Sequence, residues 1–404
     1  MHDSELAPGA EDRFNSYLDE TCAPLRDKRQ KASFAVYAAG LLADGSRKSM
    51  EPIAARSCGD PDLVPALHQR LIHFTTSAAW KDAPIRLRAA RYAIDAMEQH
   101  EAITTWIIDD TGFLKQGKHS PGVQRQYTGS AGKRTNCQIG VSLVLANSHA
   151  EIPIDFKLYI PQSWADDRAR CQAARIPDEV GYVPKWKLAL DMVESAIEAN
   201  LPRGIVLSDS GYGNTAAFRD KLDSLDLLYA VDVKSNTQVR RVGANGKLGK
   251  PMSVKQLGRR LKSKFAKTTW REGSKVDLNS RFVRIRVVVG KSGDDENQTP
   301  QWLLIEWPKG EDGPDHFVLS TLPKSIPLKE MIRTVKNRWR IERSYEDLKG
   351  EIGLDHYEGR SFIGWHHHVT VALVCYAYLV AEQARAFSPQ ASWSSCYGSI
   401  QHAA

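Results

Sequence analysis

The spacing of hydrophobic positions divides the chain into a helical first part and a mixed second part. Up to about residue 100, hydrophobic residues recur at helical intervals, as in VPALHQRLIHFTTSA and APIRLRAARYAIDAMEQHE. From Ala102 onward the chain carries short β-branched and apolar runs instead, beginning with AITTWIIDDTG, and such runs are typical of buried strands. The pattern therefore predicts an all-helical N-terminal domain at residues 1–100, followed by an α/β region.

Strands and helices alternate through residues 101–233, the first part of this α/β region. Two strands around a turn are expected in KRTNCQIGVSLVLANSHAEIPIDFKLYIP, and an amphipathic helix in PKWKLALDMVESAIEANLP. The strand in RGIVLSDSGYGN leads into the helix NTAAFRDKLDSL, for which Asn214 is the predicted N-cap, and DLLYAVDVK supplies a further strand. Because AITTWIIDDTG and RGIVLSDSGYGN both end in acids, we expect buried strands to place carboxylates at the C-terminal edge of a sheet.

The rest of the chain falls into three segments. Residues 234–325 form a predicted strand-rich insertion, with strands in RFVRIRVVVG, QWLLIEWP and DHFVLSTLP. Residues 326–387 complete the α/β region with two helices, one containing NRWRIERSYEDLKGE and one in WHHHVTVALVCYAYLVAEQARA. Residues 388–404 are rich in Ser, Gln and Ala, and we expect them to form a flexible tail.

The composition is that of a folded, water-soluble protein. The 404 residues are 42% hydrophobic and 25% charged, which suits two or three globular domains. No apolar run is long enough to span a bilayer, and the opening MHDSELAPGAEDRF has no signal-peptide pattern. The six cysteines are scattered without a CxxC pair, which argues for reduced thiols and against a zinc ribbon. We therefore expect a cytoplasmic protein.

Basic residues are concentrated in one segment, and this distribution says more than the net charge of +7. No acidic residue lies between Val233 and Trp270, whereas the basic residues there are Lys234, Arg240, Arg241, Lys247, Lys250, Lys255, Arg259, Arg260, Lys262, Lys264 and Lys267. A solvated charged surface normally mixes both signs, while a phosphate backbone requires clustered Lys and Arg. The segment therefore predicts a nucleic-acid partner.

Three acids are the candidate chemical groups. Asp110 follows the strand in AITTWIIDDTG, and Asp209 follows the strand in RGIVLSDSGYGN. If these strands are neighbours, the two carboxylates can converge at one sheet edge, and Glu342 on a helix packed over the sheet can supply a third. Three carboxylates suit Mg²⁺, or Mn²⁺ as an alternative, better than zinc. Two such ions can assist phosphoryl transfer.

The helix that carries Glu342 has a second feature. Arg338, Glu342 and Lys349 are spaced by four and seven residues, which places all three on roughly one helix face. Such spacing also suits an exposed ion-pair ladder, which stabilises a helix by only a few tenths of a kcal/mol per pair. The spacing alone leaves both interpretations open.

Taken together, these motifs resemble those of the insertion-sequence transposases of the DDE superfamily. The first and second Asp of that superfamily correspond to Asp110 in IIDDTG and Asp209 in VLSDSGYG. One branch also has a Tyr-x2-Arg-x3-Glu-x6-Lys signature and a β-strand insertion before the Glu. Arg338, Glu342 and Lys349 match its last three positions, whereas Val335 stands at the tyrosine position.

The resemblance implies a fold and an activity. The order of the predicted elements is similar to a ribonuclease H-like core, here interrupted by the strand-rich insertion and preceded by a helical DNA-binding domain. The activity implied is Mg²⁺-dependent cutting of transposon ends and their joining to target DNA, with the protein acting as a homodimer in a prokaryotic nucleoid. Asp110, Asp209 and Glu342 would bind the metal ions, and Arg338 and Lys349 would hold phosphates.

Further DNA contacts are expected on either side of this set. A Gly-rich basic loop follows Asp110, and the insertion adds basic and aromatic side chains; the residues that we predict to contact DNA are Lys115, Arg125, Lys133, Arg134, Arg259, Arg260 and Trp302. Trp307 is a second candidate for base stacking, although a strand tryptophan is more often part of the core. The triple histidine at 366–368 lacks ligands at zinc spacing, so core packing is the better interpretation.

Alternatives remain for single residues and for the function. Neighbours in a strand face opposite sides, so Asp109 competes with Asp110 for the first position; we favour Asp110 because Thr111 follows it, as in the family pattern. Asp209 could instead cap a helix, and Glu346 lies one turn beyond Glu342. The alternative functions are a nuclease of the same fold without strand transfer, and a DNA-binding regulator that has lost catalysis.

Overall fold

The computed structural model describes residues 9–271, 278–290 and 299–386, which form two compact units. The first unit comprises Met1–Ile103, Asp110–Pro202 and Ile341–Ala404, and the second comprises Thr104–Asp109 and Arg203–Arg340. Helices and strands occur in both units, so the protein is of the mixed α/β class. The helical N-terminal segment belongs to the same unit as residues 110–202, so the domain boundaries drawn from the sequence stay predictions.

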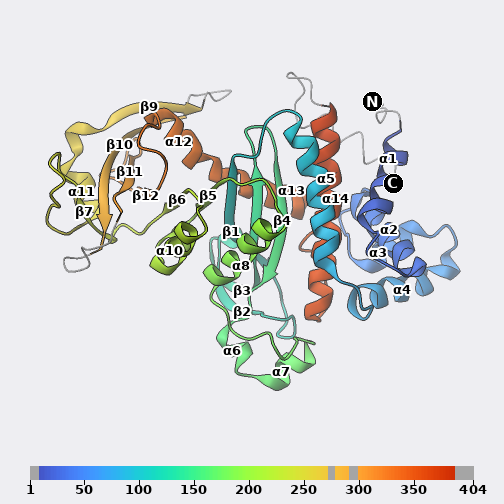
Figure 1. Cartoon of the computed structure of the whole chain (residues 1–404). Coiled ribbons are helices and arrows are strands. Elements are labelled where there is room, and N and C mark those ends of the chain that lie inside the picture. Colours follow the sequence, from blue (N-terminus) through green and yellow to red (C-terminus); the bar gives the residue numbers. More distant parts are fainter. Residues whose placement is uncertain (1–8, 272–277, 291–298, 387–404) are drawn as a thin grey trace. The chain divides into compact units, whose positions relative to one another are not determined.

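The first unit begins with five α-helices, which are labelled in Figure 1. They are α1 (Ala10–Thr21), α2 (Lys28–Leu42), α3 (Met50–Ser57), α4 (Val64–Thr76) and α5 (Asp82–Glu98). The side chain of Asp27 caps α2 by accepting a hydrogen bond from the backbone N–H of Arg29. Each helix buries one side in the shared core, for example Phe34 and Leu41 of α2, so the helical spacing of the sequence is explained by burial.

A long helix, α14 (Phe362–Ala386), is the core element of the first unit. It packs against α5, α2, α4 and the strand β4 (Glu151–Leu158), so most of its residues are buried. Figure 1 shows α5 and α14 side by side, where the small residues Ala96, Ala381 and Ala384 allow close approach. Among the described residues, no helix has both the length and the apolar character that crossing a membrane requires.

Three antiparallel strands form the sheet part of the first unit, together with the end of β1 (Thr105–Leu114). They are β2 (Gln124–Thr128), β3 (Lys133–Ala146) and β4 (Glu151–Leu158), with β3 between β2 and β4. From Cys137 to Ala146 every residue of β3 is buried, so both faces are covered. The helix α8 (Lys185–Glu198) packs on β3, while α5 and α14 pack on β4; α6 (Gln162–Ala165) and α7 (Arg168–Ala173) are short.

The second unit is built on parallel strands that continue into an antiparallel sheet. The first residues of β1 pair in parallel with β5 (Ile205–Ser208), and β5 pairs in parallel with β6 (Tyr229–Asp232). Beyond β6 the order is β12 (His316–Ser320), β11 (Gln301–Trp307), β10 (Leu278–Val289), β7 (Gln238–Arg241) and β8 (Met252–Ser253), and β9 (Ala266–Arg271) also pairs with β10. The three strands predicted for the insertion are therefore present. The helices of this unit are α9 (Ser210–Gly213), α10 (Ala216–Ser224), α11 (Val254–Arg260) and α12 (Leu328–Lys336).

Two local predictions were wrong, and a third concerns residues that the structure does not describe. β1 does not end at its acids, because Asp109 and Asp110 lie within a strand that continues to Leu114. Asn214 is not the N-cap of α10: its side-chain oxygen accepts instead from the hydroxyl of Thr237 at 2.8 Å, and Thr215 occupies the cap position. The predicted flexible tail at 388–404 lies outside the described residues.

Candidate active site

The parallel strands of the second unit bring two aspartates into register. Ile108 of β1 pairs with Ser208 of β5, and Asp109 and Asp209 are the next residues of their chains. Residues in register on neighbouring parallel strands face the same side of a sheet, so Asp109 and Asp209 follow the paired strands at matching positions. Asp209 also caps α9, because its Oδ1 accepts from the N–H of Gly211 at 2.8 Å. The cap that we considered for Asp209 is therefore present.

A third aspartate extends this row. Ser208 pairs with Val231 of β6, so Asp232 holds the position that matches Asp209. Arg338 joins two members of the row: its Nη1 lies 3.1 Å from Oδ2 of Asp109, and its Nε lies 3.8 Å from Oδ2 of Asp232. Burial raises the pKa of Asp232 and the charge of Asp209 adds to this, while Arg338 and His316 act in the opposite direction. We call Asp109, Asp209 and Asp232 the aspartate row.

Asp232 is not among the site residues that the sequence predicts. Its only signal was that the strand in DLLYAVDVK also ends in an acid, without a neighbouring motif residue. The spacing of Arg338, Glu342 and Lys349 did not predict that Arg338 would form ion pairs with the aspartate row. Arg338 lies in a 3₁₀ turn, Asn337–Trp339, directly before α13 (Arg340–Gly350).

Lys349 of α13 lies in a polar site of the first unit. Its ammonium donates to Thr111 Oγ1 at 2.8 Å, to the carbonyl oxygen of Gly112 at 2.8 Å and to Ser130 Oγ at 3.0 Å. All three acceptors are neutral, and within the described part of the chain Lys349 forms no ion pair with a carboxylate. Burial lowers the pKa of Lys349. A partly buried cation with neutral partners is suited to receive an anion.

The close packing around position 112 explains why a glycine follows Asp-Asp-Thr. A Cβ atom at position 112 would lie 2.0 Å from Oγ1 and 2.6 Å from Cβ of Thr128, which is buried. Only a residue without a side chain therefore lets β1 approach the β2–β3 hairpin this closely. That approach brings Ser130, at the hairpin tip, to Lys349.

Asp110 faces the other side of β1. Its Oδ2 lies 2.6 Å from Nζ of Lys185, on α8. Side chains alternate along a strand, so Asp109 and Thr111 share one face and Asp110 takes the opposite one. The face that carries Thr111 is the face that Lys349 contacts. Within the second unit Asp109 contacts the motif residue Arg338, whereas Asp110 contacts Lys185 within the first unit.

α13 holds Glu342 on its exposed side. Ile341, Ser344 and Leu348 are buried, and Tyr345 fixes the helix to β3 through a 2.7 Å hydrogen bond with Ser142. Glu342 and Glu346 are both exposed. The ladder interpretation fails, because Arg338 pairs with aspartates of the sheet and Lys349 contacts neutral oxygens of β1 and the hairpin.

The predicted metal set is divided between the units: Asp110 and Glu342 belong to the first and Asp209 to the second. Within the described residues, no group of three or more His, Cys, Asp or Glu side chains is arranged to hold a metal ion. The aspartate row offers carboxylate oxygens only, and these suit Mg²⁺ or Mn²⁺ rather than zinc. That Asp110, Asp209 and Glu342 bind metal ions together therefore stays a prediction.

The triple histidine is part of the core. Both ring nitrogens of His367 lie near backbone carbonyls, those of Thr75 at 2.8 Å and Trp80 at 3.1 Å, and the ring stacks on Trp80. His368 is buried between Tyr37 and the carbonyl of Leu354. Burial lowers the pKa of all three histidines, to about 4 for His366 and His368. Packing, as we expected, accounts for this motif.

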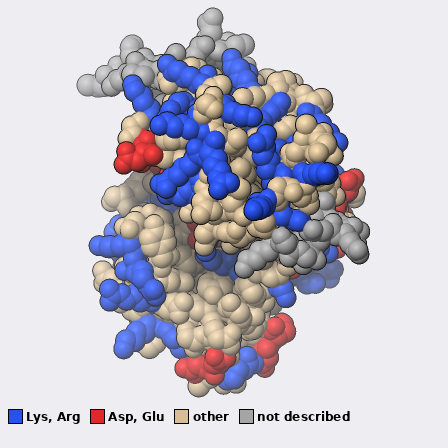
Figure 2. Space-filling view, turned by 90° about the vertical axis from the view of Figure 1, so that its left-hand side faces the viewer, with Lys and Arg blue, Asp and Glu red and all other residues tan. Residues whose placement is uncertain are grey.

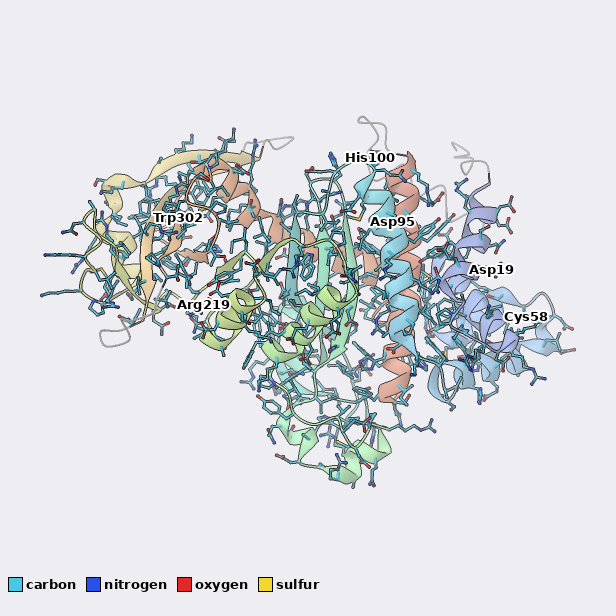
Figure 3. All side chains as sticks on the ribbon, viewed as in Figure 1. Asp19, Cys58, Asp95, His100, Arg219 and Trp302 are labelled. Atoms are coloured by element: carbon cyan, nitrogen blue, oxygen red, sulfur yellow. The ribbon has the colours of Figure 1, made fainter. Side chains whose placement is uncertain are left out.

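The predicted DNA-contact residues differ in exposure. Lys115 donates to the carbonyl of Tyr357 at 2.6 Å and is partly buried, so its ammonium already has a structural partner. Trp302, labelled in Figure 3, lies on β11 with the guanidinium groups of Arg284 and Arg286 over its ring at 4.6 and 4.9 Å. Trp307 is buried against Phe265, which excludes it as a stacking surface. The exposed residues of the set are Arg125, Lys133, Arg134, Arg259 and Arg260.

The basic segment of the second unit forms an exposed positive surface. Its exposed members are Lys234, Arg241, Lys247, Lys250, Arg259, Arg260, Lys262, Lys264 and Lys267, whereas Arg240 is buried. Figure 2 shows lysine and arginine side chains gathered on this face of the molecule. A surface of one charge sign attracts a polyanion over a distance of about a Debye length, roughly 8 Å at physiological salt.

Comparison with known proteins agrees with these observations. Residues 20–287 match the model of a family described as DDE superfamily endonuclease. The chain is 27% identical over 353 residues to a protein of Microchaete diplosiphon named a probable transposase for insertion sequence element IS701, covering 84% of this chain and 82% of that protein.

A solved structure also matches, with 10% identity. It is a piggyBac transposase synaptic complex with hairpin DNA, and the match covers 97% of this chain and 82% of that one with a TM-score of 0.40. A TM-score this low does not establish a common fold. The resemblance to insertion-sequence transposases that the motifs indicated is confirmed by the family match and the relative.

Proposed function

Because the chain belongs to the DDE superfamily endonuclease family, we propose that it is a transposase that cuts the ends of an insertion sequence. We also propose that it joins the freed ends to target double-stranded DNA by metal-dependent phosphoryl transfer. The observation that carries this proposal is the matching position of Asp109 and Asp209 after neighbouring parallel strands, with Arg338 between Asp109 and Asp232.

Asp209 and Glu342 are the second and third catalytic carboxylates in this proposal, and the first lies on β1. From the family pattern alone Asp110 is the first. The register with Asp209 and the ion pair with Arg338 support Asp109 instead, while Asp110 is engaged by Lys185 on the other face. These three carboxylates would hold Mg²⁺, with Mn²⁺ as an alternative, and a bound ion supplies activation of the attacking oxygen and charge for the leaving oxygen.

Arg338 and Lys349 are the phosphate-binding residues of the proposal. Arg338 contacts Asp109 in the second unit, and Lys349 contacts Thr111 in the first. Positive charge at these positions would stabilise the negative charge that develops on a phosphoryl group. The exposed arginines and lysines of the β2–β3 hairpin and the basic segment would bind the DNA backbone outside the cleavage point.

The wider assignment follows the same family. We propose a ribonuclease H-like core, which the parallel order β1–β5–β6 and the antiparallel order β2–β3–β4 support. The helical segment would bind DNA, and two copies would act together on paired ends in the prokaryotic cytoplasm. A nuclease without strand transfer is the second candidate, since cutting uses the same carboxylates. A regulator without catalysis is disfavoured, because clustered carboxylates repel one another without a counter-charge.

The test uses the full-length protein with DNA carrying the terminal repeats of its own element and Mg²⁺. Asp209→Asn and Glu342→Gln should abolish end cleavage, whereas the matched control Glu346→Gln, one turn further along α13, should retain it. Asp109→Asn should abolish cleavage and Asp110→Asn should retain most of it. The reverse result would assign the first position to Asp110.

The same experiment separates the candidate functions. Joining of the cleaved 3′ end to a second DNA, mapped by strand sequencing, distinguishes a transposase from a simple nuclease. Cleavage by Glu342→Gln at the wild-type rate would refute the catalytic assignment.

A further inference from the structure

Tyr127 is unusually exposed for an aromatic residue in a strand. It lies in β2, and 65% of its surface is open, more than for any other large hydrophobic side chain among the described residues. Most aromatic side chains of this size are buried, as Tyr37, Tyr229 and Tyr376 are here. The open face of this ring is available for stacking on a flat group such as a base.

The neighbours of Tyr127 on this hairpin are basic. Arg125 lies two positions earlier and so shares its side of β2, and Arg134 of β3 is its direct cross-strand partner. Both arginines are exposed. Gln126, on the other side of β2, donates instead to the carbonyl of Cys137. The exposed face of the hairpin, Arg125, Tyr127 and Arg134, thus combines an aromatic ring with two cations, the combination that binds single-stranded nucleic acid.

The hairpin is also fixed to the motif lysine. Ser130, three residues after Tyr127, accepts from Lys349 Nζ at 3.0 Å, and its Oγ lies 3.3 Å from Oγ1 of Thr111. Three residues of chain span at most about 11 Å between Cα atoms, which is about three steps of a nucleic-acid strand at 3.4 Å each. A strand whose phosphate is bound at Lys349 therefore passes within reach of Tyr127.

We propose that Tyr127 stacks on an unpaired base within about three nucleotides of the phosphate bound at Lys349, while Arg125 and Arg134 bind the phosphates on either side of that base. This inference rests on the proposed function and adds its partner, a short unpaired stretch at the cut end. The base is unpaired because bases within a duplex already stack on each other, and only an unstacked base offers a free face to a side chain.

The test measures DNA binding by the full chain, without cleavage, in buffer containing Ca²⁺ instead of Mg²⁺. The probe is a terminal-repeat duplex with a three-nucleotide single-stranded end that carries 2-aminopurine at each position in turn. Stacking on Tyr127 should change the fluorescence at one position. Tyr127→Ala should abolish that change and weaken binding roughly 5- to 100-fold, as loss of one base stack does.

Two matched variants test whether the aromatic ring of Tyr127 is responsible for the loss of binding. Tyr127→Phe keeps the ring and should bind within twofold of wild type, and Tyr182→Ala removes another exposed aromatic of the same unit and should have no effect. Melting temperatures verify that each variant is folded. An unchanged fluorescence signal in Tyr127→Ala, or an equal loss of binding to a fully paired duplex, would overturn the inference.

Failure of this inference and failure of the proposed function give different results. Failure of the catalytic proposal appears as cleavage by Glu342→Gln in Mg²⁺. Failure of the stacking inference appears only in the fluorescence and affinity of Tyr127→Ala.

Discussion

Gly112→Ala should destabilise the protein through one identifiable collision. The added methyl carbon would lie 2.0 Å from Oγ1 and 2.6 Å from Cβ of Thr128, well inside van der Waals contact. Thr128 is 1% exposed, so its side chain has no open space into which it can rotate. The backbone of Gly112 is not in the left-handed region, and therefore the penalty is steric and not conformational.

The size of this effect follows from the packing of the hairpin. Inserting a methyl group into a well-packed site costs about 1–3 kcal/mol, because β1 and the hairpin must separate. At roughly 2–4 °C per kcal/mol, the melting temperature should fall by several degrees. The carbonyl of Gly112 and the hydroxyl of Ser130 both accept from Lys349, so the same separation should lower the rate of DNA cleavage.

Thermal unfolding followed by circular dichroism measures the change, with Gly117→Ala as the control. No atom lies within 4 Å of a Cβ built at Gly117, so that variant should melt like the wild type. Thr128→Gly removes the opposing side chain, so the double variant with Gly112→Ala should lose less stability than the sum of the two single losses in a double-mutant cycle. Equal melting temperatures for Gly112→Ala and Gly117→Ala, or a coupling energy of zero, would refute the steric argument.

Two further predictions concern buried charge. Burial raises the pKa of Asp232, so the stability that its protonated form contributes is lost as pH rises from the ordinary carboxyl range through the raised pKa. Asp232→Asn cannot ionise, and its melting temperature relative to wild type should therefore increase between about pH 4 and pH 8; a constant difference would contradict this. The guanidinium of Arg86 pairs with Asp82 Oδ2 at 2.5 Å and with Asp155 Oδ1 at 3.0 Å. Arg86→Met should lower the free energy of unfolding by roughly 3–5 kcal/mol, because two partly buried carboxylates lose their partner. The exposed Arg91→Met is its control in urea unfolding, and equal losses in both variants would exclude the buried network as the cause.

The sequence predicted elements well where one local pattern decides the structure. The strand at Thr105–Leu114 and the helix α14 follow from β-branched runs and from an apolar stretch of helical length. Asn214 was placed wrongly because an Asn before a helix can cap it or bond a distant chain segment. Its bond to Thr237 depends on tertiary structure.

The site was harder to predict because the pairing register between two strands cannot be read from the sequence of one of them. Alternation showed that only one of Asp109 and Asp110 could face the other motif residues, and a following Thr was the only local guide to which. The proposal of Asp109 rests on the pairing of Ile108 with Ser208 and on the ion pair between Arg338 and Asp109. Both are contacts between segments more than 90 residues apart in the sequence, which composition and spacing do not encode.

The two motif cations differ in their partners, and this difference bears on what the site binds. Arg338 pairs with two of the three carboxylates in the aspartate row, which in the proposed function binds a divalent cation. Lys349 has the opposite character, since its ammonium contacts only neutral oxygens and its positive charge is not cancelled. In the proposed function, a phosphate would bind at Lys349 and the hairpin that contacts it, and a metal ion would bind at the aspartate row, because phosphoryl transfer uses both kinds of group.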